Sequence, residues 1–335
     1  MNKKFLVTGG SGFIGSNIVE YLVNNNASFI RILDNLSTGN LDNIRPFLKN
    51  ENVEFMYGDI SNLETCRKAT KDIDIICNQA ALGSVPRSIK DPLSSHNSNV
   101  NGFINMLIAA KENNIKRIVY ASSSSVYGDE EQLPKVENKV GNVLSPYAAT
   151  KKINEIYANV FTKCYGMEII GLRYFNVFGP RQDPNGAYAA VIPKFINLML
   201  NDKQPIINGD GSYSRDFTYI DNVVQANVLA MTTTNKKCFG EIFNIGAGGR
   251  SSIQFLFDIL KDNLKFNKEP IYGRLRAGDI PHSNASVDKA KTMLNYNPKI
   301  KFKEGIELTL HYYKNIYIDI ESLLSQQRIL NITTK

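Results

Sequence analysis

The chain has 335 residues, of which 43% are hydrophobic and 21% charged, a length that suggests about two globular domains. A net charge of +7 favours acidic ligands, but no run of five or more lysines and arginines is present, which argues against a nucleic-acid-binding arm. The four cysteines form no Cys-x-x-Cys pair, the three histidines fit no zinc motif, and no signal sequence or membrane span is recognisable, so we expect a metal-free cytoplasmic protein with free thiols that binds neither nucleic acid nor membranes.

Strand-like and helix-like segments alternate through the first half of the chain. Apolar runs predict buried strands at residues 5–9, 29–34, 53–59, 73–81, 117–123 and 168–179. Between them, apolar residues on one helical stripe predict helices that include residues 13–23 and 104–110, and a long helix over 145–166 that begins at Ser-Pro and ends at Gly166. Repeated strand–helix–strand units predict an α/β fold, a doubly wound parallel sheet with helices on both faces.

The second half of the chain is less regular. Glycines and prolines interrupt residues 179–215 and 270–283, whereas residues 216–221 and 241–246 have the apolar character of further strands. No internal repeat and no linker is recognisable, and residues 318–335 have the polar-aliphatic composition of a tail.

The first predicted strand runs directly into a glycine loop, VTGGSGFIG (residues 7–15), that opens the first predicted helix. Gly9, Gly12 and Gly15 have the spacing with which backbone N–H groups approach a pyrophosphate at a helix N-terminus. Asp34 ends the second strand 19 residues after Gly15 (34 − 15), where a carboxylate accepts hydrogen bonds from the adenosine ribose and repels a 2′-phosphate. A glycine cluster alone is weak evidence, but in this context it predicts a Rossmann domain that binds NAD rather than NADP.

A second pattern joins the serines 122–125, at the end of the fifth predicted strand, to the long helix that follows. Tyr147 and Lys151 are four positions apart on that helix and share a face. A nearby ammonium favours the phenolate form of tyrosine, which lowers its pKa and makes it a general base near neutral pH. Such a pair is common on solvated helix faces, but here it follows a nucleotide-binding half and comes 24 residues after Ser123 (147 − 123), so it predicts a catalytic site.

These features together resemble an extended short-chain dehydrogenase/reductase, and more closely the nucleotide-sugar C4-epimerases. The resemblance covers the chain to about residue 317 and rests on QAALGSVPRSI (79–89), SPYAATK (145–151), GLRYFNVFGPRQDPNGAYAAVIPKF (171–195), NGDGSYSRDFTYIDN (208–222) and RAGDIPHS (276–283). These segments are similar to the branch that acts on UDP-N-acetylglucosamine and UDP-N-acetylgalactosamine. The resemblance implies an NAD-binding Rossmann domain (1–176 plus about 217–248), a smaller C-terminal α/β domain for the UDP-sugar (177–216 plus 249–317), and a tail (318–335).

The resemblance also implies a mechanism. Ser123, four positions before the tyrosine of Val-Tyr-Gly, would bind the sugar 4-hydroxyl, and Ser124 would assist. Tyr147 would take the hydroxyl proton while a hydride passes from C4 to NAD, after which the 4-keto sugar would turn and take the hydride back on its other face. Lys151 would hold the nicotinamide ribose and lower the pKa of Tyr147. Because NAD is regenerated in each cycle, it should stay tightly bound.

The same resemblance assigns residues to the two ligands. Those implied for NAD are Gly9, Gly12, Phe13, Ile14, Gly15, Asp34, Asn35, Ser37, Gly39, Asp59, Ile60, Gln79, Ala80, Ala81, Asn99, Tyr147, Lys151, Tyr174 and Val177. Those implied for the UDP-sugar are Ser84, Arg87, Ser88, Ser123, Ser124, Tyr147, Asn176, Ala190, Val191, Lys194, Tyr213, Arg215, Arg276, Asp279 and Ser283. The two arginines Arg215 and Arg276 suit phosphate oxygens, because a guanidinium binds them in a bidentate way.

Two positions bear on which sugar is used. Epimerases that exclude N-acetyl groups tend to have a bulky tyrosine at the position of Ser283, so a serine there favours UDP-N-acetylhexosamines over UDP-glucose and UDP-galactose. Arg87 lies near the pocket that the resemblance implies, so a hexuronate or N-acetylhexosaminuronate with a carboxylate at C6 is also compatible with the sequence.

Two related enzyme classes and one kind of non-enzyme compete with the epimerase interpretation. Sugar 4,6-dehydratases and UDP-glucuronate decarboxylases carry acidic residues where this chain has Ser124 and Ser125, so hydride return is expected instead of elimination. A module that only senses NAD would not need the Ser123, Tyr147 and Lys151 set. The resemblance also implies a homodimer that pairs through the helical segments 98–113 and 147–165.

Overall fold

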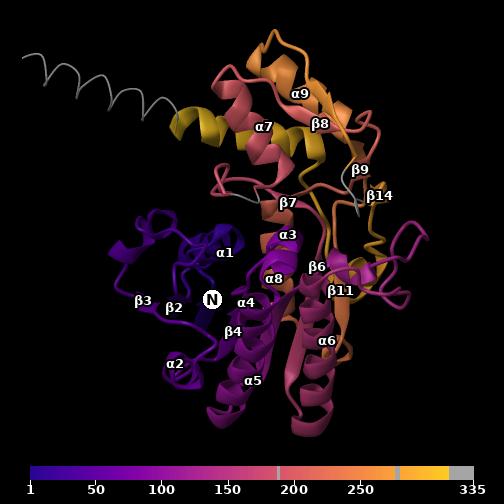
Figure 1. The fold of residues 1–335 in the computed structure, drawn as a ribbon. Helices are drawn as coiled ribbons and strands as arrows, with labels where there is room; N and C mark the ends of the chain where they lie inside the picture. The colour runs from indigo at the N-terminus through magenta and orange to yellow at the C-terminus, as the bar shows by residue number, and fades with distance from the viewer. Residues whose placement is uncertain (187–188, 276–279, 317–335) are drawn as a thin grey trace, which may run out of the picture.

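A seven-stranded parallel sheet in the order β11-β6-β5-β4-β1-β2-β3 forms the centre of the molecule (Figure 1). The computed structural model describes residues 1–186, 189–275 and 280–316. The strands of this sheet are β1 (Lys4–Thr8), β2 (Phe29–Asp34), β3 (Val53–Tyr57), β4 (Ile75–Asn78), β5 (Arg117–Ser123), β6 (Glu168–Tyr174) and β11 (Ile242–Ile245). The order reverses between β1 and β4, which is the point at which doubly wound sheets bind ligands.

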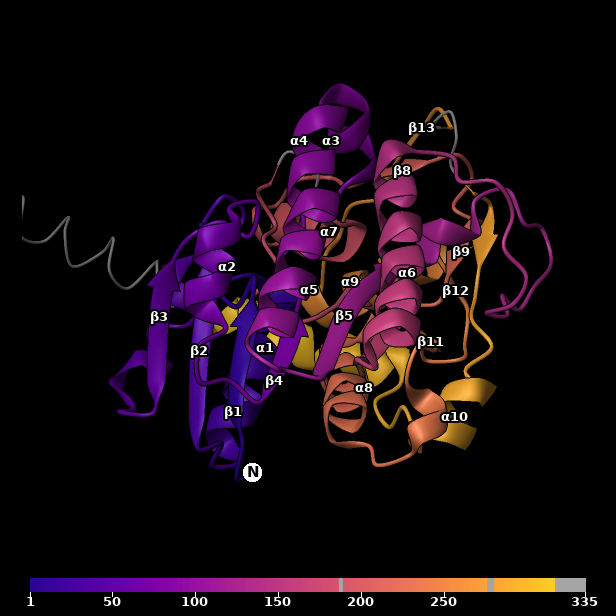
Figure 2. The ribbon, with the colours of Figure 1, turned by 90° about the horizontal axis from the view of Figure 1, so that it is seen from below.

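Helices cover both faces of the sheet. One face carries α2 (Leu63–Ala69), α5 (Gly102–Glu112) and α6 (Pro146–Tyr165), and the other carries α1 (Phe13–Asn24) and α8 (Ile220–Thr232) (Figure 2). Successive strand residues point to opposite faces. In β1, Phe5 and Val7 therefore join one buried cluster, and Leu6 joins the other. The predicted α/β doubly wound sheet is thus confirmed, with one apolar core on each side of it.

Shorter elements connect the sheet. The helices α3 (Val85–Lys90) and α4 (Pro92–His96) lead through a π-helical turn at Asn97–Asn101 into α5, and α10 (Asp288–Leu294) packs near β11. A further helix runs through residues 302–316. The 3₁₀ turns are η1 (Leu41–Asn43), η2 (Phe47–Lys49), η4 (Ser124–Tyr127) and η5 (Lys236–Cys238).

Elements within residues 177–219 and 251–283 build three small sheets and two helices above the large sheet (Figure 1). In these sheets β7 (Val177–Phe178) pairs with β10 (Thr218–Tyr219), and β9 (Ser214–Arg215) lies between β12 (Ser251–Ser252) and β14 (His282–Ser283). The third sheet pairs β8 (Ile206–Asn208) with β13 (Ile271–Gly273). The helices are α7 (Val191–Leu200) and α9 (Ile253–Leu264).

The long helix predicted over 145–166 is confirmed as α6. The hydroxyl of Ser145 accepts a hydrogen bond from the Ala148 N–H at 3.1 Å and caps the helix start. Gly166 ends it in the left-handed conformation, with φ +64°.

Two predicted strands take a different path in the structure, and the strand predicted over 73–81 is shorter and covers only Ile75–Asn78. The segment 168–179 forms two strands, β6 and β7, because Asn176 adopts φ +34° and turns the chain between them. The segment 216–221 is a strand only at β10, and helix α8 starts at Ile220. Both differences occur where the chain leaves the large sheet for the smaller ones.

The cysteines Cys66, Cys77, Cys164 and Cys238 are unpaired. Within residues 1–186, 189–275 and 280–316, no group of three or more His, Cys, Asp and Glu side chains is placed to hold a metal ion. No helix in the same part of the chain is long and apolar enough to cross a membrane.

Candidate active site

A cavity of about 1420 Å³ lies at the carboxyl ends of the sheet strands. Its lining includes residues that end or directly follow neighbouring strands: Gly9 after β1, Asp34 on β2, Gly58 after β3, Gln79 after β4, Ser123 on β5 and Tyr174 on β6. Of the positions implied for NAD, all but Asn99 line this cavity. The cavity therefore lies where a doubly wound sheet binds a dinucleotide.

The glycine loop leaves no room for side chains. Gly9 has φ +64°, and a Cβ there would lie 2.7 Å from the Ala80 nitrogen. A Cβ on Gly15 would lie 2.7 Å from Gly10 Cα and closer still to the Gly9 carbonyl oxygen. Gly12 precedes α1 and provides no side-chain cap, so N–H groups of the first turn are left for an anion. This cradle fits the pyrophosphate of NAD.

Asp34 closes the same end of the cavity. Its carboxylate accepts hydrogen bonds from the Ser11 N–H at 2.9 Å and the Leu36 N–H at 2.8 Å. Burial raises the pKa of Asp34, although these two backbone hydrogen bonds partly oppose the shift. A Cβ on Gly39 would lie 3.0 Å from each carboxylate oxygen, so the chain passes close over this group. A carboxylate has further acceptor capacity, which suits a ribose diol and not a 2′-phosphate.

Asp59 lies on the neighbouring part of the lining. It accepts hydrogen bonds from the Asn35 side-chain amide at 2.6 Å and from the Ser61 N–H at 2.7 Å. Burial by itself would raise the pKa of Asp59, but the hydrogen bonds from Ser61 and Asn35 outweigh it and hold the pKa below its ordinary value. Asn35 is therefore fixed beside the cavity by an ionised partner.

The structure separates the four serines 122–125 by their surroundings. Ser122 is buried and donates a hydrogen bond to Glu155 at 2.7 Å. Ser122, Ser123 and Ser124 line the cavity, and the Ser123 hydroxyl accepts a hydrogen bond from the Ser125 N–H at 3.2 Å. The Ser125 hydroxyl is buried and has no hydrogen-bond partner in the described part of the chain. Ser122 is buried and its hydroxyl is bound to Glu155, whereas Ser123 and Ser124 are half-buried, so the middle two serines are the ones placed to meet a ligand.

A buried ion pair lies beneath these serines. The Arg173 guanidinium donates to both carboxylate oxygens of Glu155 at 2.8 and 3.0 Å, and the two side chains are 2% and 3% exposed. Arg173 also donates to the Glu137 carbonyl at 3.1 Å and lies 4.8 Å from the ring centre of Tyr127. Since Glu155 belongs to α6 and Arg173 to β6, the pair joins the helix that carries Tyr147 to the sheet.

Tyr147 and Lys151 face the cavity from the first turns of α6. The Tyr147 N–H donates to the Ser88 hydroxyl at 3.0 Å. Burial raises the pKa of Tyr147, and a hydrogen bond with Ser123 partly opposes this. Tyr147 and Ser123, which lie far apart in the sequence, are thus in contact at the cavity wall.

Lys151 shows how this surface differs from a solvated helix face. Its ammonium lies 5.9 Å from the ring centre of Tyr147 and donates to the Ala121 carbonyl at 2.8 Å. Burial lowers the pKa of Lys151 to about 8. The sequence predicts a lowered pKa for Tyr147, whereas in the structure burial dominates and raises it.

A second cavity of about 300 Å³ shares Asn176 and Val177 with the first. Five positions implied for the UDP-sugar line it as well: Ala190, Val191, Lys194, Tyr213 and Arg215. Its other lining residues are largely apolar and include Phe178, Phe195, Ile206 and Phe217. The Arg215 guanidinium donates to the Pro281 carbonyl at 3.1 Å. Apolar walls with two cationic side chains can hold a flat ring and its phosphates.

Several predicted residues lie outside the lining of both cavities. The Ser84 hydroxyl caps α3 by accepting from the Arg87 N–H at 3.1 Å. Ser88 is buried against Tyr147, and its hydroxyl donates to the Val85 carbonyl at 2.8 Å. Asn99 bonds to the Leu82 N–H at 2.8 Å and to Thr150 at 3.1 Å. Ser88 and Asn99 thus support the residues around the cavity from behind.

Three substrate positions remain. Ser283 lies on β14 in register with Arg215, outside both linings. Arg276 and Asp279 lie outside the residues that the structure describes.

The large cavity also has a wall that was not predicted. Arg181, Gln182, Tyr312 and Tyr313 line it, and the Arg181 guanidinium donates to the Asn17 side chain on α1 at 2.6 Å. The segment GPRQ belongs to one of the motifs that carry the resemblance, but its partner on α1 is 164 residues away in the sequence. No local pattern indicates such a contact.

Comparisons with known proteins point to one family. The sequence model of the NAD dependent epimerase/dehydratase family matches residues 5–246 of this chain. A putative UDP-glucose 4-epimerase of Methanocaldococcus jannaschii is 42% identical over 92% of this chain and 98% of its own length.

Two solved structures are also similar. The UDP-N-acetylglucosamine 4-epimerase of Methanobrevibacter ruminantium, in complex with UDP-N-acetylmuramic acid, is 39% identical, with a TM-score of 0.87 and coverage of 94% of this chain and 99% of that chain. The UDP-glucuronic acid 4-epimerase of Bacillus cereus, in complex with UDP-glucuronic acid and NAD, is 32% identical, with a TM-score of 0.87 and coverage of 94% and 100%.

Proposed function

Because the chain belongs to the NAD dependent epimerase/dehydratase family and uses its cofactor NAD, we propose that it interconverts UDP-sugars that differ in configuration at C4. One observation carries this proposal. Ser123, Tyr147 and Lys151 meet in a cavity that shares two lining residues with a smaller one containing Arg215. A sugar in the large cavity can therefore reach a base while its nucleotide occupies the small one.

The residues that would hold NAD fit it. The glycine cradle would bind the pyrophosphate, Asp34 the adenosine ribose, and Lys151 the nicotinamide ribose. When bound, NAD supplies reversible hydride transfer at sugar C4.

Tyr147 would act as the base in this reaction. Ser123 would orient the 4-hydroxyl group, and the Tyr147 phenolate would take its proton. Burial disfavours the phenolate, so it requires a nearby positive charge, which the Lys151 ammonium provides. The proton would return to the sugar oxygen when the C4 carbonyl is reduced again.

The serines 124 and 125 support epimerisation over elimination. Dehydration or decarboxylation of the oxidised sugar needs acid–base groups. From the sequence, acidic residues are expected at these two positions in the sugar 4,6-dehydratases and the UDP-glucuronate decarboxylases. Ser124 lines the cavity with a hydroxyl, and the Ser125 hydroxyl is buried. Neither carries a carboxyl group, so we propose that hydride return is the fate of the oxidised sugar.

The small cavity would hold the nucleotide. Its apolar walls suit uracil, and Lys194 and Arg215 suit the diphosphate. We propose that the division of the chain into 1–176 plus about 217–248 and 177–216 plus 249–317 separates the cofactor side from the nucleotide side. In this proposal Arg276 and Asp279 complete the nucleotide site.

We further propose that UDP-N-acetylhexosamines are the preferred substrates. Ser283 pairs with Arg215 in the strand register, and its small side chain would leave space for an N-acetyl group beside the nucleotide site. The 39% identical relative from Methanobrevibacter ruminantium is a UDP-N-acetylglucosamine 4-epimerase. Arg87, on which a uronate substrate would rely, lies outside the lining of both cavities, as Ser283 does, so the lining does not decide between these sugars and the preference rests on this relative and on the small size of Ser283.

A substrate panel tests the proposal. The purified protein is incubated separately with UDP-GlcNAc, UDP-Glc, UDP-GlcA and UDP-GlcNAcA, and the C4 epimer is followed by NMR. We expect the fastest turnover with UDP-GlcNAc, and Tyr147→Phe should abolish turnover while NAD stays bound. Absence of any epimer would refute the 4-epimerase assignment, and faster turnover of another sugar would refute the preference.

A matched pair of variants tests the role of Ser283. Ser283 and Ser251 flank Arg215 on its two sides in the small sheet. Ser283→Tyr should slow UDP-GlcNAc more than UDP-Glc, because the added ring would fill the space for the acetyl group. Ser251→Tyr adds the same ring on the other side and should leave the ratio of the two rates unchanged. Equal effects of both variants on this ratio would contradict the role of Ser283 in leaving space for the acetyl group.

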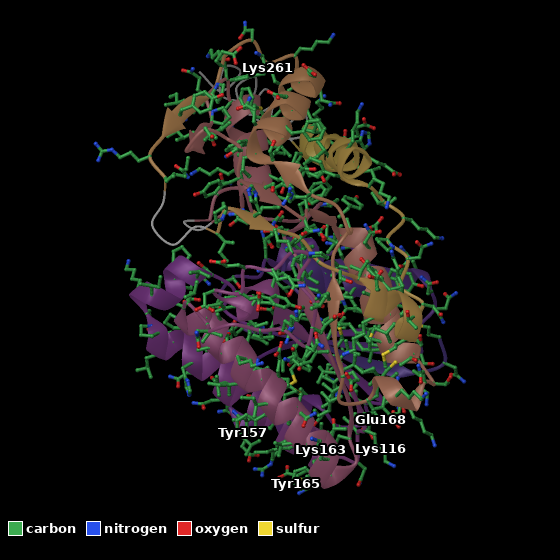
Figure 3. The ribbon with its side chains drawn as sticks, turned by 90° about the vertical axis from the view of Figure 1, so that its right-hand side faces the viewer. Lys116, Tyr157, Lys163, Tyr165, Glu168 and Lys261 are labelled. Atoms are coloured by element: carbon green, nitrogen blue, oxygen red, sulfur yellow. The ribbon has the colours of Figure 1, made fainter. Side chains whose placement is uncertain are left out.

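We also propose that two copies pair through the helical segments 98–113 and 147–165, which contain α5 and α6, together with the adjoining α3 and α4. Ile156, Tyr157 and Val160 on α6 are 54%, 37% and 44% exposed, and Ile89 and Leu93 on the adjoining α3 and α4 are 63% and 68% exposed. Figure 3 shows Tyr157 at the outer edge of the molecule. A second copy is the occupant that the resemblance implies, and it would cover this apolar surface.

A further inference from the structure

Asp216 is a fully buried carboxylate between two residues of the small cavity, Arg215 and Phe217, but it does not itself line that cavity. Its oxygens accept hydrogen bonds from the Ala247 N–H at 2.8 Å, the Gly248 N–H at 3.2 Å and the Ala285 N–H at 3.2 Å. Ala247 and Gly248 follow β11 of the large sheet, and Ala285 follows β14 of the small one. One side chain therefore connects the two sheets.

The backbone of Asp216 contacts two more positions implied for the substrate. Its N–H donates to the Ser283 carbonyl at 2.8 Å, and its carbonyl accepts from the Asn176 amide at 3.4 Å. Asn176 lines both cavities. Asp216 thus follows Arg215 in the sequence, and its backbone is hydrogen-bonded to Asn176 and Ser283.

The space around the carboxylate is filled. A Cβ on Gly246 would lie 2.6 Å from an Asp216 oxygen and 3.0 Å from the Ala285 Cβ. The Gly246 carbonyl is itself fixed by the Tyr296 hydroxyl, which donates to it at 2.9 Å. The carboxylate therefore has little freedom to move, and glycine at position 246 is the residue that leaves room for it.

Holding a carboxylate here has a cost in stability. Burial raises the pKa of Asp216 to about 6, although the backbone hydrogen bonds from Ala247, Ala285, Gly248 and Gly249 oppose the shift. A buried charge of this kind is weak evidence for stabilisation, so its value is better sought in geometry.

We propose that Asp216 is a positioning residue that holds Arg215 and Asn176 in place for the UDP-sugar by joining the loop after β11 to the chain after β14. The inference rests on the proposed function, because it concerns the same nucleotide site. It predicts that disturbing the carboxylate weakens substrate binding and leaves the chemical step and NAD binding intact.

Two variants disturb the carboxylate in different ways. Asp216→Asn keeps its shape but presents an amide N–H₂ to backbone N–H donors, so at least one hydrogen bond is lost. Gly246→Ala keeps the charge and displaces the carboxylate by steric contact. Asp129→Asn is the control, because Asp129 also accepts a backbone hydrogen bond, from Asn142 at 2.6 Å, but lines neither cavity.

The holoprotein variants are compared by bound NAD content, by kcat and KM for UDP-GlcNAc, and by calorimetric titration with UDP. We expect Asp216→Asn and Gly246→Ala to raise KM and the UDP dissociation constant by about 10- to 100-fold. Their kcat should stay within about twofold of wild type, with full NAD content. Asp129→Asn should match the wild type in all four quantities.

The outcomes separate the two proposals. If the wild type binds no UDP and epimerises no UDP-sugar, the proposed function fails before any variant is measured. If the wild type is active and Asp216→Asn and Gly246→Ala match it, the positioning role is overturned. A variant that loses NAD, loses kcat or does not fold points to general structural support, and this result also overturns the positioning role.

Discussion

The run of serines 122–125 offers a strict test, because two neighbouring residues of the same type should fail in different ways. Ser122→Ala removes a hydroxyl that donates to Glu155 at 2.7 Å in a buried position. A hydrogen bond to a charged group contributes about 1.5 to 3 kcal/mol. The same Glu155 oxygen still accepts from Arg173 at 2.8 Å, so we expect the lower end, about 1.5 kcal/mol of unfolding free energy.

Ser123→Ala should have the opposite profile. The Ser123 hydroxyl accepts one long hydrogen bond, from the Ser125 N–H at 3.2 Å, so its removal should cost about 0.5 kcal/mol. The same hydroxyl lies at the cavity wall and contacts Tyr147, so turnover should fall by about 100-fold or more. Ser122→Ala should keep turnover within about twofold of wild type.

Two assays distinguish these profiles. The chain has no tryptophan, so urea unfolding is followed by far-ultraviolet circular dichroism, and turnover is followed by NMR on the UDP-sugar. The reasoning is refuted if Ser122→Ala abolishes turnover at unchanged stability, or if Ser123→Ala turns over like the wild type. Measurement of bound NAD in both variants excludes loss of the cofactor as the cause.

Three further predictions concern the cofactor, the pH dependence and the assembly. Gly15→Ala should lose bound NAD, since its Cβ would meet the glycine loop, whereas Gly249→Ala, with nothing within 4 Å, should keep it; equal NAD content in both would contradict the cradle. Lys151 has a pKa of about 8 and Tyr147 a raised one, so the pair as a whole loses its first proton near pH 8. The active form is this singly deprotonated pair, with a Tyr147 phenolate and a Lys151 ammonium, so kcat/KM should rise with pH and level off above pH 8. A value of kcat/KM that falls through pH 8 would be inconsistent with this pair. Sedimentation should show a dimer that Ile156→Asp converts to a monomer; a wild-type monomer would contradict the pairing.

The large sheet could be predicted from the sequence because its signals are local. Continuous apolar runs, a glycine loop and a capped helix each depend on neighbouring residues, and β1, β2, β5 and α6 lie within about a residue of their predicted bounds. The break at Asn176 was missed, because a left-handed residue in an apolar run leaves the pattern unchanged. The short strands of the small sheets have too few residues for a period to be recognised.

In the candidate site, too, the residues with local signals could be predicted from the sequence, and those that depend on distant contacts could not. The glycines, Tyr147 and Lys151 follow from spacing, whereas the different surroundings of the four serines depend on Glu155, which is 33 residues from Ser122. The pKa direction of Tyr147 also depends on burial, which no spacing reveals. Asp216 and Arg181 act through contacts with distant segments, and the motifs that contain them do not show which atoms they bind.

The two cavities that share Asn176 and Val177 have a consequence for how an oxidised sugar is retained. A 4-keto sugar that must present either face of C4 to the cofactor cannot be bound tightly through its sugar ring. If the nucleotide is bound in the smaller cavity, it acts as a tether, and the local concentration of the ketone at the reducing site stays high while the ring reorients. A variant that binds the nucleotide more weakly should then release the 4-keto sugar into solution and leave the protein with reduced cofactor. Both amounts should increase in proportion to the loss of nucleotide affinity.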